Sequence, residues 1–253
     1  MEMPSGMEQS VPKEAVEAGR RASIWAIVIG VFTAPAKAFD DYVAKPNLWI
    51  PCLLLIILIG ISSAVLAPYQ AKAGYELMKR SSSLPAPALK AIEDQVAQSN
   101  PITSALWGAV MGVIMTLLLA LLAWAIGSIF FSGQTRFAVL WGVTMLGGLI
   151  GLVGKLLTIP LVIAKNSIDV SFGLAALWPN KNIASVFYLL LVYLDAFAIW
   201  GIIVTGIGYA AVFKFTRGKG IMVSAIAVVV LLVGFMMLQI LGMSLMGVKV
   251  SFF

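Results

Sequence analysis

Five long runs of apolar residues divide the chain, and each is long enough to cross a lipid bilayer. About 20 helical residues, at about 1.5 Å of rise each, span the hydrocarbon core of a membrane. The expected spans cover residues 49–66, 102–131, 136–163, 183–215 and 221–246. The sequence therefore predicts an all-α fold, a polytopic membrane protein with five transmembrane helices.

The composition agrees with an integral membrane protein. Of the 253 residues, 61% are hydrophobic and 11% are charged, with a mean hydropathy of +1.01, which lies outside the range of soluble domains. The net charge of +6 does not indicate nucleic-acid binding, because the basic residues are scattered singly at the ends of apolar runs. The lipid bilayer is the first expected partner, and no nucleic acid is expected.

Two segments precede the first span. Residues 1–22 are polar and are expected to form a loose tail, without a secretory signal peptide. In residues 23–46, the apolar stretch that ends before Pro35 is too short to cross a membrane, and the proline would break or kink a helix. Phe39 and Tyr42 then form an apolar side opposite charged residues. An amphipathic or re-entrant segment at the membrane interface is expected, with a folded core helix as the alternative.

Residues 47–253 make up the predicted membrane domain, and its longest extramembrane loop covers residues 69–100. Leu89, Ile92 and Val96 lie at helical spacing within this polar loop. A short amphipathic helix resting on the membrane or on the bundle is therefore expected there.

A single acid, Asp195, lies in the middle of the fourth apolar run. An ionised carboxylate inside the hydrocarbon core costs about 3 kcal/mol on insertion scales, so the side chain is expected to face other helices. Three interpretations remain open at this point: a polar anchor that holds the bundle together, a proton or ion relay, and a protonated, passive acid.

Lys155 is the other charged residue within an apolar run. If the third and fourth spans run in opposite directions, Lys155 and Asp195 lie on the same side of the membrane midplane at similar depths. An ion pair between them would neutralise both charges. The alternative is that the lysine side chain extends to the membrane interface. The two residues are the candidate intramembrane polar site.

Two glycine pairs carry the spacing that lets membrane helices approach closely. These pairs are Gly108 with Gly112 in the second span and Gly147 with Gly151 in the third. They are interpreted as packing surfaces within the bundle, and self-association into a homo-oligomer through them is the alternative.

The sequence offers no constellation of residues for catalysis. The chain has no histidine, and its one cysteine, Cys52, lies within an apolar run, so neither an intrachain disulfide nor a thiolate metal site can form. Nucleophilic and metal-dependent hydrolysis both need a set of bases or ligands that the spans do not supply. The prediction is a protein that is not an enzyme, with no cofactor and no metal.

Several short motifs, taken in order, resemble the Yip-one domain family of Ypt/Rab GTPase-interacting membrane proteins. The similarity covers about residues 25–240. It rests on a proline-bearing amphipathic segment, on NLWIP at 47–51, on LDAFAIW at 194–200, on GIG at 206–208 and on a basic turn with Lys219. The family-motif residues are Pro35, Phe39, Trp49, Pro51, Phe197, Trp200, Gly206 and Gly208.

The resemblance implies five membrane helices, a cytosolic N-terminus and, in eukaryotic members, a role in vesicle traffic through GTPase binding. The short N-terminal region and the extended first loop are similar to the prokaryotic branch of the family. A membrane scaffold or adaptor with a protein partner at the cytoplasmic face is therefore expected. The alternative is a small transporter or channel that uses Asp195 as an intramembrane proton or ion site.

The distribution of cations predicts the orientation of the chain. The side that holds the N-terminus carries nine Lys and Arg residues, and the opposite side carries seven, four of them in the long first loop. Cytoplasmic loops are enriched in these residues. The N-terminus is expected in the cytoplasm and the C-terminus outside, in the plasma (inner) membrane of a prokaryote.

Overall fold

The computed structural model describes residues 23–81, 85–98, 100–168, 170–178 and 185–245, so the predicted tail of residues 1–22 lies outside the described residues. The helices, in chain order, are α2 (Ile24–Thr33), α3 (Pro35–Ala44), α4 (Trp49–Ser81), α5 (Ala86–Ala97), α6 (Pro101–Phe131), α7 (Phe137–Lys165), the 3-10 helix η1 (Leu174–Leu177), α8 (Val186–Tyr193), α9 (Ala196–Phe213) and α10 (Arg217–Leu245).

Five of these helices, α4, α6, α7, α9 and α10, are long and apolar enough to cross a membrane. The described residues contain no strand, and Gly173 and Asp195 form an isolated bridge. The predicted all-α, five-span membrane fold is therefore confirmed.

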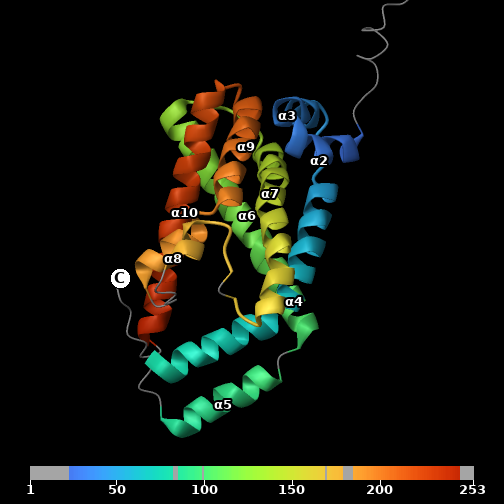
Figure 1. Ribbon diagram of the computed structural model, residues 1–253. Coiled ribbons are helices and arrows are strands. Elements are labelled where there is room, and N and C mark those ends of the chain that lie inside the picture. The colour runs from blue at the N-terminus through green and yellow to red at the C-terminus, as the bar shows by residue number, and fades with distance from the viewer. Residues whose placement is uncertain (1–22, 82–84, 99, 169, 179–184, 246–253) are drawn as a thin grey trace, which may run out of the picture.

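The two ends of the bundle differ (Figure 1). Helices α2 and α3 lie at the same end as the α6–α7 turn, residues 132–136, and the α9–α10 turn, residues 214–216. We call this the α3 end. The opposite end, which carries α5 and the last turn of α7, is the α5 end. The long helices run between the two ends, so successive spans are antiparallel.

Segment 23–46 forms two short helices that meet at Ala34. Pro35 begins α3, because a residue without an N–H group is well tolerated in the first turn of a helix and breaks a helix that precedes it. Phe39 and Tyr42 are fully buried, while Lys37 and Asp40 are exposed, so α3 is amphipathic as its sequence predicts. The apolar side packs against α7 and α9.

Helix α4 is longer than the predicted first span. The sequence predicts an end before Pro68, but the helix continues to Ser81. Its last turns, teal in Figure 1, run across the α5 end, so the helix bends along its length. Pro68 lies within it and cannot donate a backbone hydrogen bond, which accounts for a bend rather than a break. The short helix predicted in the loop is present as α5, and Tyr75 Oη donates to Glu93 Oε2 at 2.9 Å between the two helices.

The fourth apolar run is divided, whereas the sequence predicts one helix over residues 183–215. Helix α8 ends at Tyr193 and α9 begins at Ala196, so Leu194 and Asp195 lie between two helices. An aspartate side chain competes for backbone N–H groups and favours the start of a helix over its interior. The prediction that Asp195 lies in the middle of one membrane helix is therefore wrong.

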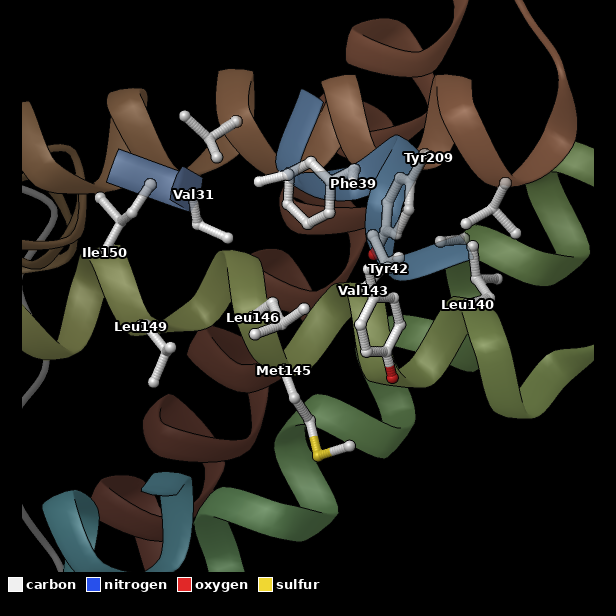
Figure 2. Close-up of a cluster of buried hydrophobic side chains, with 14 of the residues drawn as sticks. Val31, Phe39, Tyr42, Leu140, Val143, Met145, Leu146, Leu149, Ile150 and Tyr209 are labelled. Carbon is white, nitrogen blue, oxygen red and sulfur yellow. The ribbon is translucent and has the colours of Figure 1, made fainter. Parts of the chain in front are cut away.

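The core of the bundle is centred on α7, which packs against α4, α6 and α9 and also touches α2 and α3. Figure 2 shows the buried side chains that α7 contributes, including Leu140, Met145 and Leu146, together with Phe39 of α3. One buried polar pair joins α7 to α9: the hydroxyl groups of Thr144 and Tyr209 lie 3.0 Å apart. This hydrogen bond links two helices whose other contacts are mostly apolar.

The predicted glycine pairs occupy different environments. A Cβ atom at Gly108 would overlap the Ser63 side chain of α4, and one at Gly112 would overlap Ile59 of the same helix. A Cβ atom at Gly147 would overlap Thr205 of α9, whereas Gly151 has open space beside it, with nothing within 4 Å. Three of the four glycines thus lie where α4 approaches α6 or α7 approaches α9.

Candidate functional site

Asp195 acts at the start of α9. Its Oδ1 atom accepts a hydrogen bond from Ala198 N at 2.7 Å, which satisfies one of the backbone N–H groups that a helix leaves unpaired at its N-terminus. Its backbone pairs with Gly173 in the isolated bridge, and a Cβ at Gly173 would lie 2.9 Å from Asp195 Cα.

Lys155 and Asp195 lie close in the sequence to two residues that are in contact. The neighbouring Gly154 faces Phe197, two residues after the acid, because a Cβ there would lie 2.6 Å from the Phe197 ring. Among the residues the structure describes, however, Lys155 and Asp195 form no ion pair. The structure therefore gives the Asp195 side chain a backbone partner in α9 in place of the predicted ion pair.

The aromatic residues of the LDAFAIW motif link α9 to its surroundings. Phe197 packs edge-on against Phe172 of the preceding loop, with ring centroids 5.7 Å apart. Trp200 packs against Phe32 of α2 at 6.0 Å and against Phe197 at 6.5 Å. This row of rings connects the loop after α7 with the α2–α3 segment along one face of α9.

The NLWIP motif forms the start of α4. Asn47 Oδ1 accepts hydrogen bonds from Trp49 N at 3.0 Å and from Ile50 N at 3.3 Å. Tyr42 Oη donates to Asn47 O at 3.1 Å, and burial raises the pKa of Tyr42 to about 12, so this hydroxyl keeps its proton. Pro51 fits the first turn of α4, and Trp49 is 84% exposed. Sequence reasoning placed Tyr42 on an apolar side and Asn47 in a motif but did not assign their hydrogen bonds, although an asparagine just before a helix is a common cap.

The GIG motif lies where α9 is closest to its neighbours. A Cβ at Gly206 would overlap the backbone of Ile221 in α10, and one at Gly208 would overlap Val143 of α7. Both glycines therefore remove side chains from tight helix crossings.

A cleft opens at the α3 end between α3, α9 and the α9–α10 turn. Its charged lining consists of Asp40 from α3, Lys214 from the turn and Arg217 from the start of α10, and the apolar residues Ile207 and Ala211 also line it. Its volume is about 350 Å³, within the lower range of ligand sites. The sequence predicts only a basic turn here and does not bring Asp40 to it.

Lys214 has an unusual backbone at this cleft. It ends α9 in the left-handed conformation, with φ 57°, a position where glycine is the usual residue. The nitrogen atoms of Lys214 and Phe215 donate to the carbonyl of Ala210, and these bonds hold the turn. The backbone that carries the positively charged Lys214 side chain is thereby held beside the cleft.

The described residues contain no group of three or more His, Cys, Asp or Glu side chains that could hold a metal ion. The residues around Asp195 and the family motifs instead provide helix caps and close helix crossings, which position the helices. The cleft at the α3 end presents a charged surface.

Together, these features define a helical integral membrane protein with five spans and a short helix pair packed across one end. The family model described as the Yip1 domain matches residues 29–238. The chain belongs to the Yip1 domain family, which confirms the resemblance seen in its motifs. No curated protein and no solved structure matches the chain.

The role of Asp195 as a cap gives a prediction for its variants. Asp195→Asn keeps a side-chain oxygen for Ala198 N and is expected to change the free energy of unfolding little, whereas Asp195→Leu is expected to cost about 1 kcal/mol. Thermal unfolding in detergent measures both.

A double variant tests the absence of an ion pair between Lys155 and Asp195. Without such a pair, the losses of unfolding free energy from Lys155→Met and Asp195→Asn should add. A double variant that loses clearly less stability than the sum of the two single losses would show that an ion pair is present.

Proposed function

We propose that this protein is a non-enzymatic membrane scaffold or adaptor that binds a protein partner at the α3 end. The cleft at this end carries the proposal, because it combines exposed charges with a small apolar base at a bundle surface. Lys214 and Arg217 outnumber Asp40 there, which favours an acidic segment of the partner.

The orientation of the chain supports a cytoplasmic partner. The described part of the α3 end carries six cations, Lys37, Lys45, Arg136, Lys214, Arg217 and Lys219, against the two acids Asp40 and Asp41. Short loops rich in Lys and Arg stay in the cytoplasm. We infer that the α3 end faces the cytoplasm and that the chain lies in a prokaryotic plasma membrane, with its C-terminus outside.

The alternative, a transporter or channel built on Asp195, has weaker support. A conduction path needs polar groups that are available to the solute. Asp195 Oδ1 is bonded to the backbone of α9, and the motif residues around it pack against one another. Self-association into a homo-oligomer also stays a proposal. Of the glycine pair in the third span, Gly147 packs against α9, and only Gly151 has open space beside it for a second copy of the chain.

Photocrosslinking in cells tests the docking proposal. A photoreactive residue in place of Lys37, which is exposed beside the cleft, is expected to give a discrete crosslinked species. The combined change Lys214→Glu and Arg217→Glu should reduce its yield at least about tenfold, since it replaces attraction of an acidic segment with repulsion. Thermal unfolding of the charge-reversed protein should match the parent.

Lys165→Glu, at the opposite end of the bundle, is the matched control and should leave the yield unchanged. A species whose yield does not respond to charge reversal at the cleft, or a complete lack of a species from Lys37, would contradict a partner at the α3 end.

A further inference from the structure

A second groove opens at the α5 end, where the bent part of α4 and helix α5 face the first turns of α6. It consists of two adjoining hollows that share Ala71, Ser104 and Trp107. The outer hollow has a volume of about 520 Å³ and the inner one about 370 Å³. Both lie within the range of small-molecule sites. The proposed partner cleft lies at the other end of the bundle.

The outer hollow has a mixed, uncharged lining. Amide and hydroxyl groups come from the end of α5 and the start of α6, among them Gln95, Gln98, Asn100 and Thr103, and they alternate with the apolar side chains of Ala71, Val96 and Trp107. Thr103 and Ser104 donate their hydroxyl hydrogens to Asn100 O, at 2.8 and 3.1 Å, so their oxygens remain able to accept. The amides can both donate and accept. A hydroxyl-rich group matches this lining better than an anion, because no cation lines the hollow.

The inner hollow continues along the α4–α6 interface. Ala67, Gly108 and Met111 line it together with the polar side chains of Ser63, Gln70 and Ser104, and Met111 is 43% exposed on the side of the bundle. Trp107 lies in both hollows and is 64% exposed. Tryptophan is favoured at the boundary between membrane and water. The groove therefore runs from the amide groups at the end of α5 to the apolar residues Gly108 and Met111 of the α6 span.

We propose that this groove binds a membrane lipid with an uncharged, hydroxyl-rich headgroup. The headgroup lies against Gln95, Gln98 and the Trp107 ring, and the first part of an acyl chain lies along Gly108 and Met111. A lipid fits better than a soluble sugar because the two hollows form one amphipathic path.

Lipid binding to the purified full-length protein, measured by native mass spectrometry, tests this proposal. The detergent should be an amine oxide without a sugar headgroup, so that it does not compete. A glucosyl diacylglycerol is expected to bind at least about tenfold more tightly than diacylglycerol or phosphatidylglycerol. Free glucose at millimolar concentration should not displace it.

Two variants locate the site. Trp107→Leu should weaken binding of the glucosyl lipid about tenfold, whereas Trp124→Leu, a lipid-exposed tryptophan of the same helix outside the groove, should not. Gln98→Lys, at an exposed position, should shift the preference toward phosphatidylglycerol. Equal affinity for the three lipids, displacement by glucose, or equal effects of the two tryptophan variants would overturn the proposal.

Discussion

Replacing Gly206 with alanine is expected to force α9 away from α10 and to lower the free energy of unfolding by about 3 kcal/mol. A Cβ at this position would overlap Ile221 Cα and would lie 2.8 Å from Ile221 N. Gly220 makes the reciprocal approach, because a Cβ there would overlap Gly206 O. Backbone atoms cannot rotate aside as a side chain can, so the two helices themselves must move. Thermal unfolding in detergent measures the loss.

Gly201→Ala is the matched control in the same helix. Nothing lies within 4 Å of a Cβ at Gly201, so the added methyl group meets no neighbour. Alanine also has the higher helix propensity, and the variant is expected to be neutral or more stable by up to about 1 kcal/mol. Similar losses at Gly201 and Gly206 would contradict the close crossing of α9 and α10.

Replacing Phe39 with alanine is expected to release α3 from the bundle, with a loss of about 3 kcal/mol or more. The ring is fully buried, and a Cβ at Gly208 of α9 would lie 3.0 Å from it. Cysteine labelling reports the release. In a Cys52→Ser background, Ala38→Cys places a thiol at a position only 4% exposed, and its reaction with a maleimide should become much faster when Phe39 is removed.

Lys37→Ala provides the control for this second experiment, because Lys37 lies on the exposed side of the same helix. It should leave the labelling rate unchanged. If Phe39→Ala also leaves the rate unchanged, α3 does not depend on its apolar side for its position, and the cleft would lack the wall that carries Asp40.

The long spans could be predicted from the sequence because the bilayer fixes their length and excludes charge. Predicted spans 102–131 and 136–163 agree within two residues with α6 and α7. The start of α6 is also marked locally, since Asn100 Oδ1 accepts from Ile102 N at 2.8 Å, as expected of an asparagine followed by a proline.

The bends and breaks could not be predicted in the same way. Pro68 stands next to polar residues, which favours a helix end, but packing of the bent part of α4 on α5 continues the helix. Asp195 stands among apolar residues, which favours one continuous span, but its side chain caps a new helix. In both cases a local hydrogen-bonding preference or a tertiary contact decides, and average hydropathy reports neither.

The candidate site was only partly visible in the sequence. The motif residues around Phe197, Trp200 and Gly206 could be picked out by resemblance, but their contacts with Gly154, Phe32 and Ile221 depend on the packed bundle. The cleft is harder still, because Asp40 and the cations of the α9–α10 turn lie far apart in the chain. No periodicity within one segment can bring such residues together.

Proton flux in proteoliposomes distinguishes an adaptor from a conduit most directly. Liposomes that contain the purified protein, with a pH-sensitive dye inside, are given a pH gradient, and an added ionophore confirms that the vesicles are sealed. The adaptor account predicts the same slow decay of the gradient as in protein-free liposomes, for the parent and for Asp195→Asn alike. A faster decay in the parent that disappears in Asp195→Asn would contradict it and establish Asp195 as a transport site.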